Sequence, residues 1–406
     1  MRAICLVTLF ACTAKPHVDA PDLAPADRHY TIWLGGARIG TAVEHETRSS
    51  TGLVLLRTEA MRFRRGDATI TIATDIEIEA DHTLAPRRVH WIERGPLTRE
   101  ATATRDAARW TIEHDGEISH LAGSAIPAEL VPLFVRRDGK FAGRVFLPAR
   151  AFVAGAGRVE PVAPARLVAR LALDGGALAE ATIDLDSDGS YERVVDGEGV
   201  IAIRATPAQA ALAFEPVDLI AATAIPITGT RSDRIVLDGT LTLPALPGQA
   251  SHAHDGGIAL ELSARLPGDL DPAAHGRDRS HDIVALVAQV QARIAPDLAA
   301  GLTSARDAIA AKAGDCTTFA LVYAALASRQ RIETHVVTGL RIDGDRLVRH
   351  RWAVSWTGRS WIAVDAAYGA VPAGGDLIGL AVHDADDAGL VAGEAALTMV
   401  HAAAWR

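Results

Sequence analysis

The sequence predicts a multidomain protein in which an all-β antiparallel domain precedes an α+β domain. Three observations lead to this prediction. The chain has 406 residues, enough for about two or three domains with cores of their own. Short runs rich in β-branched residues, divided by Gly, Asp and Pro turn signals, fill residues 28–215. From Asp282 onward, apolar residues recur at helical spacing before strand-like alternation returns.

The β-rich part, residues 28–215, is predicted to form an antiparallel sheet or sandwich. No long stretch within it has helical periodicity, apart from a short one at 207–214. Residues 216–266 are interpreted as a connector with strands of its own, and residues 267–406 as the second domain. The clearest candidate strands are Tyr30–Val43, Val54–Arg64, Ala68–Ala80 and Arg87–Arg94.

The N-terminus resembles a bacterial export signal. A short positive start precedes an apolar stretch that is too short to cross a bilayer, and this stretch ends in Leu9-Phe10-Ala11-Cys12, similar to a lipobox. We expect a signal peptide with a lipobox over residues 1–12, lipidation of Cys12 and a flexible tether over residues 13–27. An ordinary cleaved signal peptide with an incidental Cys is the alternative. The predicted location is the bacterial cell envelope, as a periplasmic or outer-membrane lipoprotein held to the membrane through a lipid anchor at Cys12.

The charge balance argues against one class of partner. The formal net charge is −9, whereas a protein that binds nucleic acid normally presents a basic face. We therefore expect no nucleic-acid partner. The sequence contains no nucleotide-binding loop and no Cys-rich zinc pattern, so we expect neither a cofactor nor a metal.

Cysteine usage singles out one residue. Cys5 lies in the segment to be removed and Cys12 is the candidate anchor, so Cys316 is the only thiol left in the folded body. A lone thiol in an oxidising compartment is a liability unless it is buried or used. Cys316 packed as a small hydrophobic residue is the alternative to a reactive thiol.

The residues around Cys316 predict a helix N-terminus. Gly314-Asp315-Cys316 leads directly into apolar residues at helical spacing, which run from Phe319 to Leu326. Asp315 suits the N-cap position. The positive end of a helix dipole favours the thiolate and lowers the pKa of a thiol from about 8.5, and its free N–H groups can bind an oxyanion.

Two predicted strands downstream bring a His and an Asp together. Residues 349–356 and 361–365 each read as a strand, with a turn between them. If Thr357-Gly358 forms a two-residue loop, His350 directly faces Asp365, within reach of a hydrogen bond. Because Thr is a poor residue for such a turn, a longer loop with a shifted register is the alternative.

A His oriented by an Asp beside a helix N-terminal Cys is the arrangement that nucleophilic thiol catalysis requires. The imidazole takes or shares the thiol proton, and the carboxylate fixes the imidazole tautomer and stabilises the imidazolium. Taken singly, His350 could be an ordinary strand histidine and Asp365 a residue of the strand end. The three together predict a catalytic site of Cys316, His350 and Asp365.

These motifs resemble the transglutaminase-like superfamily, a group with a papain-like core, in its bacterial exported form. The resemblance covers about residues 270–380 and includes Gly314-Asp315-Cys316, His350-Arg351-Trp352 and Trp361-Ile362-Ala363-Val364-Asp365. It implies Cys316 as the nucleophile, His350 as the general base and acid, and Asp365 as the residue that orients His350. The chain departs from the family pattern at Thr318, where many members have Glu, and at Arg331-Ile332-Glu333, which replaces a common Gly-Ile-Pro turn.

The resemblance implies a thiol enzyme that acts on amide or peptide bonds through an acyl-enzyme on Cys316. We favour hydrolysis, as in a peptidase or amidase, over cross-linking, with a protein or peptide from the envelope as substrate. A catalytically silent envelope binding protein with the same fold is the alternative, because the β-rich region makes up about half of the chain. A structural envelope protein in which Cys316 is merely buried is a third.

Overall fold

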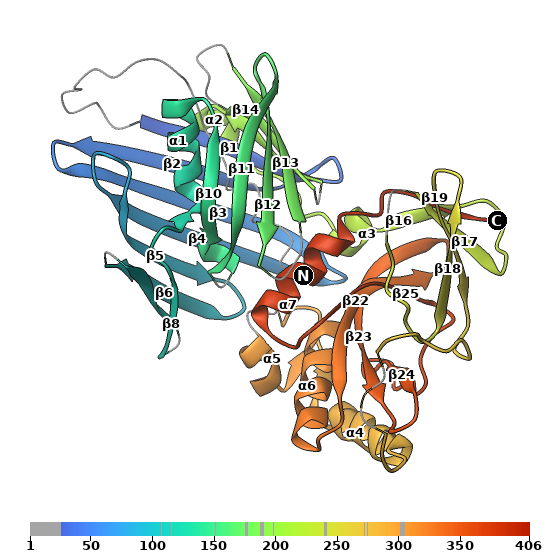
Figure 1. The fold of residues 1–406 in the computed structure, drawn as a ribbon. Helices are drawn as coiled ribbons and strands as arrows, with labels where there is room; N and C mark the ends of the chain where they lie inside the picture. The colour runs from blue at the N-terminus through green and yellow to red at the C-terminus, as the bar shows by residue number, and fades with distance from the viewer. Residues whose placement is uncertain are drawn as a thin grey trace. The chain divides into compact units, whose positions relative to one another are not determined.

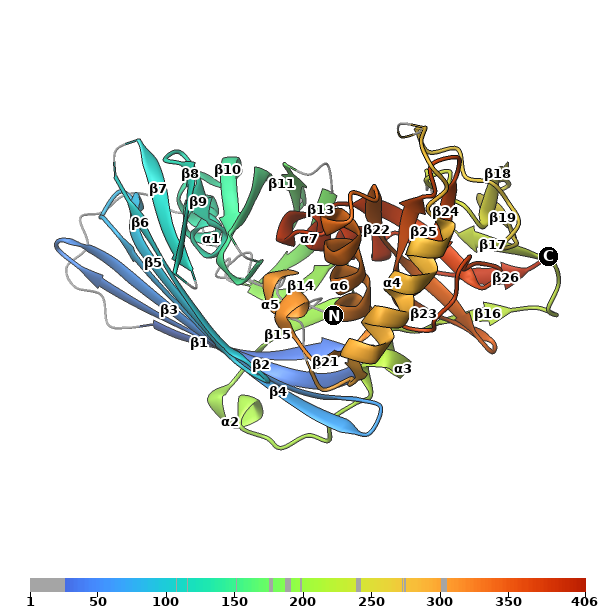
Figure 2. The ribbon, with the colours of Figure 1, turned by 90° about the horizontal axis from the view of Figure 1, so that it is seen from below.

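The computed structural model of the chain divides into two compact units, Arg2–Leu219 and Ile220–Arg406. The structure describes residues 26–406 except 107, 115, 151, 175–177, 187–190, 198, 239–241, 272, 274 and 301–304. Figures 1 and 2 show the elements of each unit. The fold is a large antiparallel β-sheet domain followed by a mixed α+β region, as the sequence predicts. Within the described part of the chain, no helix is long and apolar enough to cross a membrane.

The N-terminal unit consists of one 15-stranded sheet, in the order β8-β7-β6-β5-β4-β3-β2-β1-β15-β14-β13-β12-β11-β10-β9. Its pairs are antiparallel except for β9 with β10. Alternating burial along β3 and β4 shows the two-residue periodicity expected of a sheet with one buried face. The strands are β1 Ala26–Leu34, β2 Ala37–Ser49, β3 Gly52–Arg65, β4 Ala68–Ala80, β5 Pro86–Arg94, β6 Thr98–Arg105, β7 Arg109–His114, β8 Glu117–Ala122, β9 Ile126–Pro127, β10 Phe141–Leu147, β11 Val153–Ala163, β12 Arg166–Leu173, β13 Leu178–Leu185, β14 Tyr191–Asp196 and β15 Val200–Ala205.

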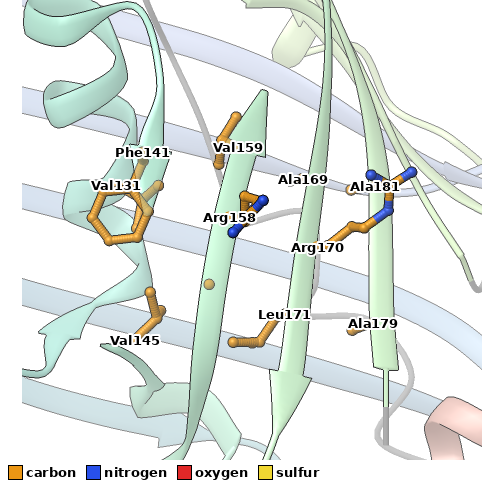
Figure 3. A pocket seen from close by; sticks show the side chains of 11 residues that line it. Val131, Phe141, Val145, Arg158, Val159, Ala169, Arg170, Leu171, Ala179 and Ala181 are labelled. Carbon is orange, nitrogen blue, oxygen red and sulfur yellow. The ribbon is translucent and has the colours of Figure 1, made fainter. Parts of the chain in front are cut away.

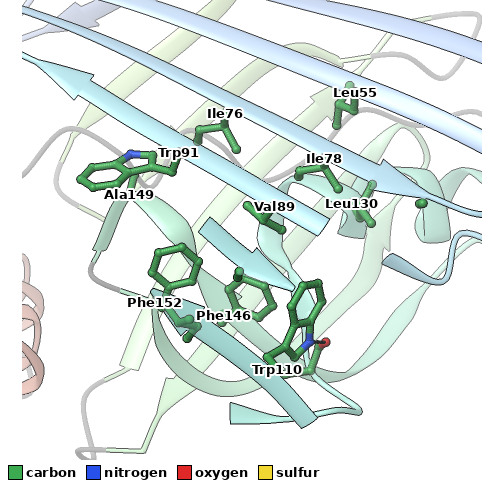
Figure 4. Packing of buried hydrophobic residues seen from close by; sticks show 14 of the residues in the cluster. Leu55, Ile76, Ile78, Val89, Trp91, Trp110, Leu130, Phe146, Ala149 and Phe152 are labelled. Atoms are coloured by element: carbon green, nitrogen blue, oxygen red, sulfur yellow. Dashed lines mark hydrogen bonds between the residues drawn. The ribbon is translucent and has the colours of Figure 1, made fainter. Parts of the chain in front are cut away.

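A short helical segment fills the buried face of this sheet. It consists of η2 (Ala128–Leu130) and α1 (Val131–Asp138), with a second 3-10 turn, η3, at Pro148–Arg150. Leu130 and Leu133 pack with strand residues such as Trp91, Trp110 and Phe146. Figure 4 shows the rings of Trp110 and Phe146 next to each other. The sequence prediction missed α1, because a helix of eight residues is too short for its apolar residues to repeat over several turns. α2 (Pro207–Ala210) falls within the predicted helical stretch 207–214.

The C-terminal unit is built on a nine-stranded sheet in the order β18-β19-β17-β26-β16-β23-β22-β25, with β24 beside β23. The strands are β16 Ile225–Thr228, β17 Arg234–Asp238, β18 Gln249–His254, β19 Gly257–Leu262, β22 Thr334–Asp343, β23 Arg346–Trp356, β24 Trp361–Val364, β25 Leu377–His383 and β26 Ala403–Trp405. The predicted connector, residues 216–266, thus supplies strands to the same sheet as β22 and β23. The final strand β26 lies between β16 and β17.

The helices among the described residues of this unit are α4 Ser280–Arg293, α5 Ala305–Ala310, α6 Cys316–Arg329 and α7 Asp387–Leu397, and α3 Leu219–Thr223 lies at its start. A small ladder pairs β20 Ala295–Pro296 with β21 Ala313–Gly314. α4 and α6 pack their apolar sides together against β23 and β24, so that Ile283, Phe319 and Ala353 share one core. This packing places the N-terminus of α6 beside β23.

Candidate active site

Cys316 is the first residue of α6, and Asp315 is its N-cap, which confirms both predictions. One oxygen of the Asp315 carboxylate accepts the backbone N–H of Thr317 at 3.0 Å and that of Thr318 at 3.4 Å. A Cβ at Gly314 would lie 2.1 Å from the Thr318 hydroxyl, so the turn before the helix requires glycine. Cys316 is half-buried at the positive end of the α6 dipole, where a thiolate is stabilised.

His350 and Asp365 are in direct contact. Nε2 of His350 lies 2.7 Å from Oδ2 of Asp365, and both side chains are buried. The two-residue loop and the strand register from which this contact was predicted are wrong, because Trp356 pairs with Trp361 rather than with Arg359. His350 is therefore a diagonal neighbour of Asp365 and does not lie directly opposite it. A slip of two residues keeps every side chain on its original face of the strand, so the contact survives.

The loop between β23 and β24 explains the shifted register. The Thr357 hydroxyl accepts the N–H of Arg359 at 3.3 Å and that of Ser360 at 3.1 Å, and the Thr357 N–H donates to the Ser360 carbonyl. These bonds close a loop that includes Thr357 through Ser360, with Gly358 at a φ of 95°. Thr357 thus caps a longer loop and avoids the positive φ of a two-residue turn.

Asp365 is held in place by the loop that follows it. Its Oδ1 accepts the N–H of Ala367 at 3.2 Å and of Tyr368 at 3.4 Å, which leaves Oδ2 for His350. Arg341 places a nitrogen 3.6 Å from the same Oδ2 and its guanidinium carbon 3.4 Å from the centre of the Tyr368 ring. The Tyr368 ring meets His350 edge-on at 5.5 Å. Arg341 was not identified from the sequence, because nothing local marks it.

The thiol of Cys316 hydrogen-bonds the His350 ring. Because Nε2 faces Asp365, Nδ1 is the nitrogen left for the sulfur. Burial and Asp315 act to raise the pKa of Cys316, but His350 holds it below its ordinary value. Burial acts to lower the pKa of His350, but Asp365 and Cys316 raise it to about 10. These opposite shifts favour a thiolate beside an imidazolium.

A break in strand pairing gives the sulfur access to β23. On one edge of β23, Leu347 pairs with Ile225 of β16, and Ala353 pairs with Val364 of β24. Between these two points the backbone N–H of Arg351 donates a hydrogen bond to Cys316. The thiol thus occupies an interval of the strand edge where neither β16 nor β24 is paired.

A hollow in the N-terminal unit is the second candidate for a functional site. The hollow in Figure 3 lies in the N-terminal unit and is lined by apolar side chains of α1 and β10–β13 together with Arg158 and Arg170. It contains no nucleophile and no acid. Among the residues that the structure describes, no three His, Cys, Asp or Glu side chains gather as ligands for a metal ion.

The C-terminal unit thus combines an α+β fold with a Cys at a helix N-terminus and a His–Asp pair on the adjoining strands. Residues 270–366 match the model of the transglutaminase-like superfamily, so the chain carries a transglutaminase-like domain. This range includes Cys316, His350 and Asp365. No curated protein matches the sequence.

Three solved structures resemble the chain distantly. A β-barrel-like protein of a domain of unknown function from Brucella abortus is 11% identical with a TM-score of 0.34, over 45% of this chain and 97% of that one. A "putative cysteine protease" from Cytophaga hutchinsonii is 16% identical with a TM-score of 0.25, over 41% and 76%. A protein from Pseudomonas aeruginosa is 10% identical with a TM-score of 0.27, over 44% and 94%. Likenesses at this level carry no argument about function.

Cys12, the predicted lipidation site, lies outside the residues that the structure describes. Of the departures from the family pattern, Arg331 follows the end of α6 with a φ of 56°, the left-handed conformation that glycine adopts most easily. This strain lies at the opposite end of α6 from Cys316.

Proposed function

We propose that the transglutaminase-like domain is a thiol enzyme that cleaves amide or peptide bonds through an acyl-enzyme on Cys316. The observation that supports this most directly is the relay of contacts from Cys316 to His350 and from His350 to Asp365, at 2.7 Å for the second contact. Each member comes from a different element: Cys316 from α6, His350 from β23 and Asp365 from the end of β24.

The chemistry follows from the two pKa shifts. The Cys316 thiolate attacks the carbonyl carbon, and the proposed donor to the oxyanion is the Cys316 N–H, since the Asp315 cap accepts the N–H groups of Thr317 and Thr318. The His350 imidazolium gives its proton to the leaving amine as the C–N bond breaks, which leaves a thioester on Cys316. Water then attacks the thioester while His350 accepts a proton, and the acid product leaves with the thiol restored.

Hydrolysis and cross-linking share the same acyl-enzyme and differ only in the acceptor. Water reaches any exposed thioester, whereas transfer needs a bound amine, so we favour a peptidase or amidase. The predicted export signal and the predicted lipid anchor at Cys12 support a location of this activity in the bacterial envelope, with proteins or peptides found there as the proposed substrates.

The first test is the pH dependence of Cys316 alkylation by iodoacetamide in the full chain, followed by mass spectrometry of the peptide that contains Cys316. We expect an apparent pKa well below about 8.5, which returns toward that value in His350→Ala. His335→Ala removes another histidine of the same sheet and is the matched control. A slow thiol that is indifferent to His350 would contradict the proposal and favour a binding protein.

A second measurement separates hydrolysis from transfer. p-Nitrophenyl acetate acylates an activated thiol, and mass spectrometry detects the acetyl group on Cys316. Its loss with time in buffer, compared with its loss in the presence of an alkyl amine, gives the preferred acceptor. Rapid loss to water supports a hydrolase, and appearance of the acetylated amine as the main product supports a transferase.

A further inference from the structure

Arg351, the residue after His350, has a buried side chain with partners on three other elements. Its Nε donates to the Thr338 hydroxyl on β22 at 2.8 Å, and its Nη1 donates to the Thr317 hydroxyl on α6 at 3.1 Å. Its Nη2 contacts the Glu394 carboxylate and the Leu390 carbonyl on α7. Arg351 is 6% exposed and Glu394 is 4% exposed. A single guanidinium therefore joins β22, β23, α6 and α7.

Arg351 and one of its partners each lie next to a member of the candidate triad in the sequence. Thr317 follows Cys316 at the first turn of α6, and Arg351 follows His350 on β23. The Arg351 backbone N–H also bonds the Cys316 thiol. Hence the same residue contacts the sulfur through its backbone and the helix that carries the sulfur through its side chain.

The position of α7 depends on two glycines that face the sheet. A Cβ at Gly393 would lie 2.3 Å from the Thr338 hydroxyl, and one at Gly389 would lie 2.8 Å from Nδ1 of His383. Such close approach is open only to glycine. It brings the neighbouring Glu394 near enough to reach Arg351.

A directional chain of hydrogen bonds completes the arrangement. The His383 Nδ1 lies 2.8 Å from the Asp384 carbonyl, so Nδ1 carries the proton and Nε2 accepts the Thr338 hydroxyl at 2.8 Å. Thr338 in turn accepts from Arg351. Burial and the Arg351 cation lower the pKa of His383 to about 4, which keeps this histidine neutral and its Nε2 available as an acceptor.

We propose that Arg351, held by Glu394 of α7, is a positioning residue for the thiol site. Its planar fork fixes the first turn of α6 against β23 and so sets the distance and orientation of the Cys316 sulfur relative to His350. A buried ion pair is by itself a weak source of stability, whereas its fixed geometry suits this task. The inference rests on the proposed function, because it names what supports the Cys316–His350 pair.

The test compares two hydroxyls that link α6 to β23. Thr317→Val removes the acceptor of Arg351 beside Cys316, and Thr317→Ser retains it. Tyr323→Phe removes the bond between Tyr323 and Ser355, which is 2.8 Å long and lies farther along the same helix and strand. Alkylation of Cys316 by iodoacetamide is measured from pH 5 to pH 10 in the full chain, with thermal unfolding recorded for each variant.

We expect Thr317→Val to slow alkylation at pH 6 about three- to tenfold by raising the apparent thiol pKa, and Thr317→Ser to stay within about twofold of the parent. Tyr323→Phe should leave the pKa unchanged even where it lowers the unfolding temperature. In a His350→Ala background Thr317→Val should have no further effect, because the two act through one contact. Glu394→Ala should repeat the Thr317→Val shift from the α7 side.

The outcomes separate the two proposals. A His350-dependent thiol pKa that neither Thr317→Val nor Glu394→Ala moves would overturn the role of Arg351 and leave the proposed function standing. Equal shifts in Thr317→Val and Tyr323→Phe would show a merely structural role for Arg351. A thiol pKa that does not depend on His350 in the parent chain would overturn both proposals.

Discussion

Both units of the protein bury charged side chains, but they arrange them differently. In the N-terminal unit, Arg57 lies between Glu44 at 2.5 Å and Glu59 at 2.6 Å, and Arg28 lies 2.7 Å from Glu46. These residues come from the neighbouring strands β1, β2 and β3, and opposite charges are in direct contact. In the C-terminal unit, Cys316, His350 and Asp365 come from a helix, a strand and the loop after another strand.

The comparison shows that burial of charge does not by itself produce a reactive group. Burial acts to raise the pKa of Glu44, but Arg57 and Arg28 hold it below its ordinary value, so Glu44 stays charged and inert. For Cys316 and His350 the pKa values instead shift in opposite directions: that of the thiol is lowered and that of the imidazole is raised, so the proton passes from the sulfur to the ring. The Arg–Glu ion pairs of the N-terminal unit contain no nucleophile that shares a proton with a base.

The largest expected effect is a loss of Cys316 reactivity in the C-terminal unit. Asp365→Asn removes the negative charge that raises the pKa of His350 and replaces an acceptor by a group that can present its amide to Nε2. We expect acetylation of Cys316 by p-nitrophenyl acetate to slow about 10²- to 10⁴-fold, with the alkaline limit of activity moved to lower pH. The acylation rate measured by stopped flow checks this. A loss below about tenfold would mean that Asp365 does not orient His350.

The next largest effect is a loss of stability when the buried ion pairs of Arg57 in the N-terminal unit are removed. Arg57→Met leaves Glu44 and Glu59 buried with fewer partners, and we expect the free energy of unfolding of that unit to fall by about 3–5 kcal/mol. Urea unfolding followed by tryptophan fluorescence measures the change. Arg158→Met, which removes the exposed pair of Arg158 with Glu160, is the control and should cost less than about 1 kcal/mol. The Cys316 alkylation profile should be unaltered in both variants.

The smallest effect concerns Glu129, a buried acid near the same ion pairs. Burial raises its pKa to about 8 from an ordinary value of 4.5, so the folded unit binds this proton more tightly than the unfolded chain does. The stability that this proton contributes is full below pH 4.5 and is lost as the pH rises through about 8. Glu129→Gln should abolish this slope and gain roughly 1–3 kcal/mol over the parent between pH 5 and pH 8. Parallel slopes in parent and variant would contradict it.

Local patterns in the sequence predicted much of the fold. The alternation of Ile and Thr predicted β4 over Ala68–Ala80, and helical spacing predicted α4 and α6. The prediction missed α7, whose Gly389 and Gly393 weaken any helix signal while serving its close packing. It also missed β26, a three-residue strand that exists only because β16 and β17 pair with it.

The candidate site shows the same division between local and long-range information. The N-cap at Asp315 and the helix that starts at Cys316 follow from adjacent residues. The His350–Asp365 contact was predicted through an incorrect loop, and it survived because strand side chains repeat every two residues. Arg351 and Glu394, by contrast, carry no local signature, since they are 43 residues apart and meet only through the packing of α7.

The sequence by itself therefore determined which residue types are available, where Cys316 lies on its helix and which faces of the strands carry His350 and Asp365. These features depend on hydrogen bonds and periodicities that span a few residues. Only the tertiary structure decided the register of the β23–β24 hairpin, the unpaired interval of β23 that receives the sulfur, and the ion pair that joins α7 to the site. Each of these depends on contacts between distant segments, whose energies are set by packing and not by local propensity.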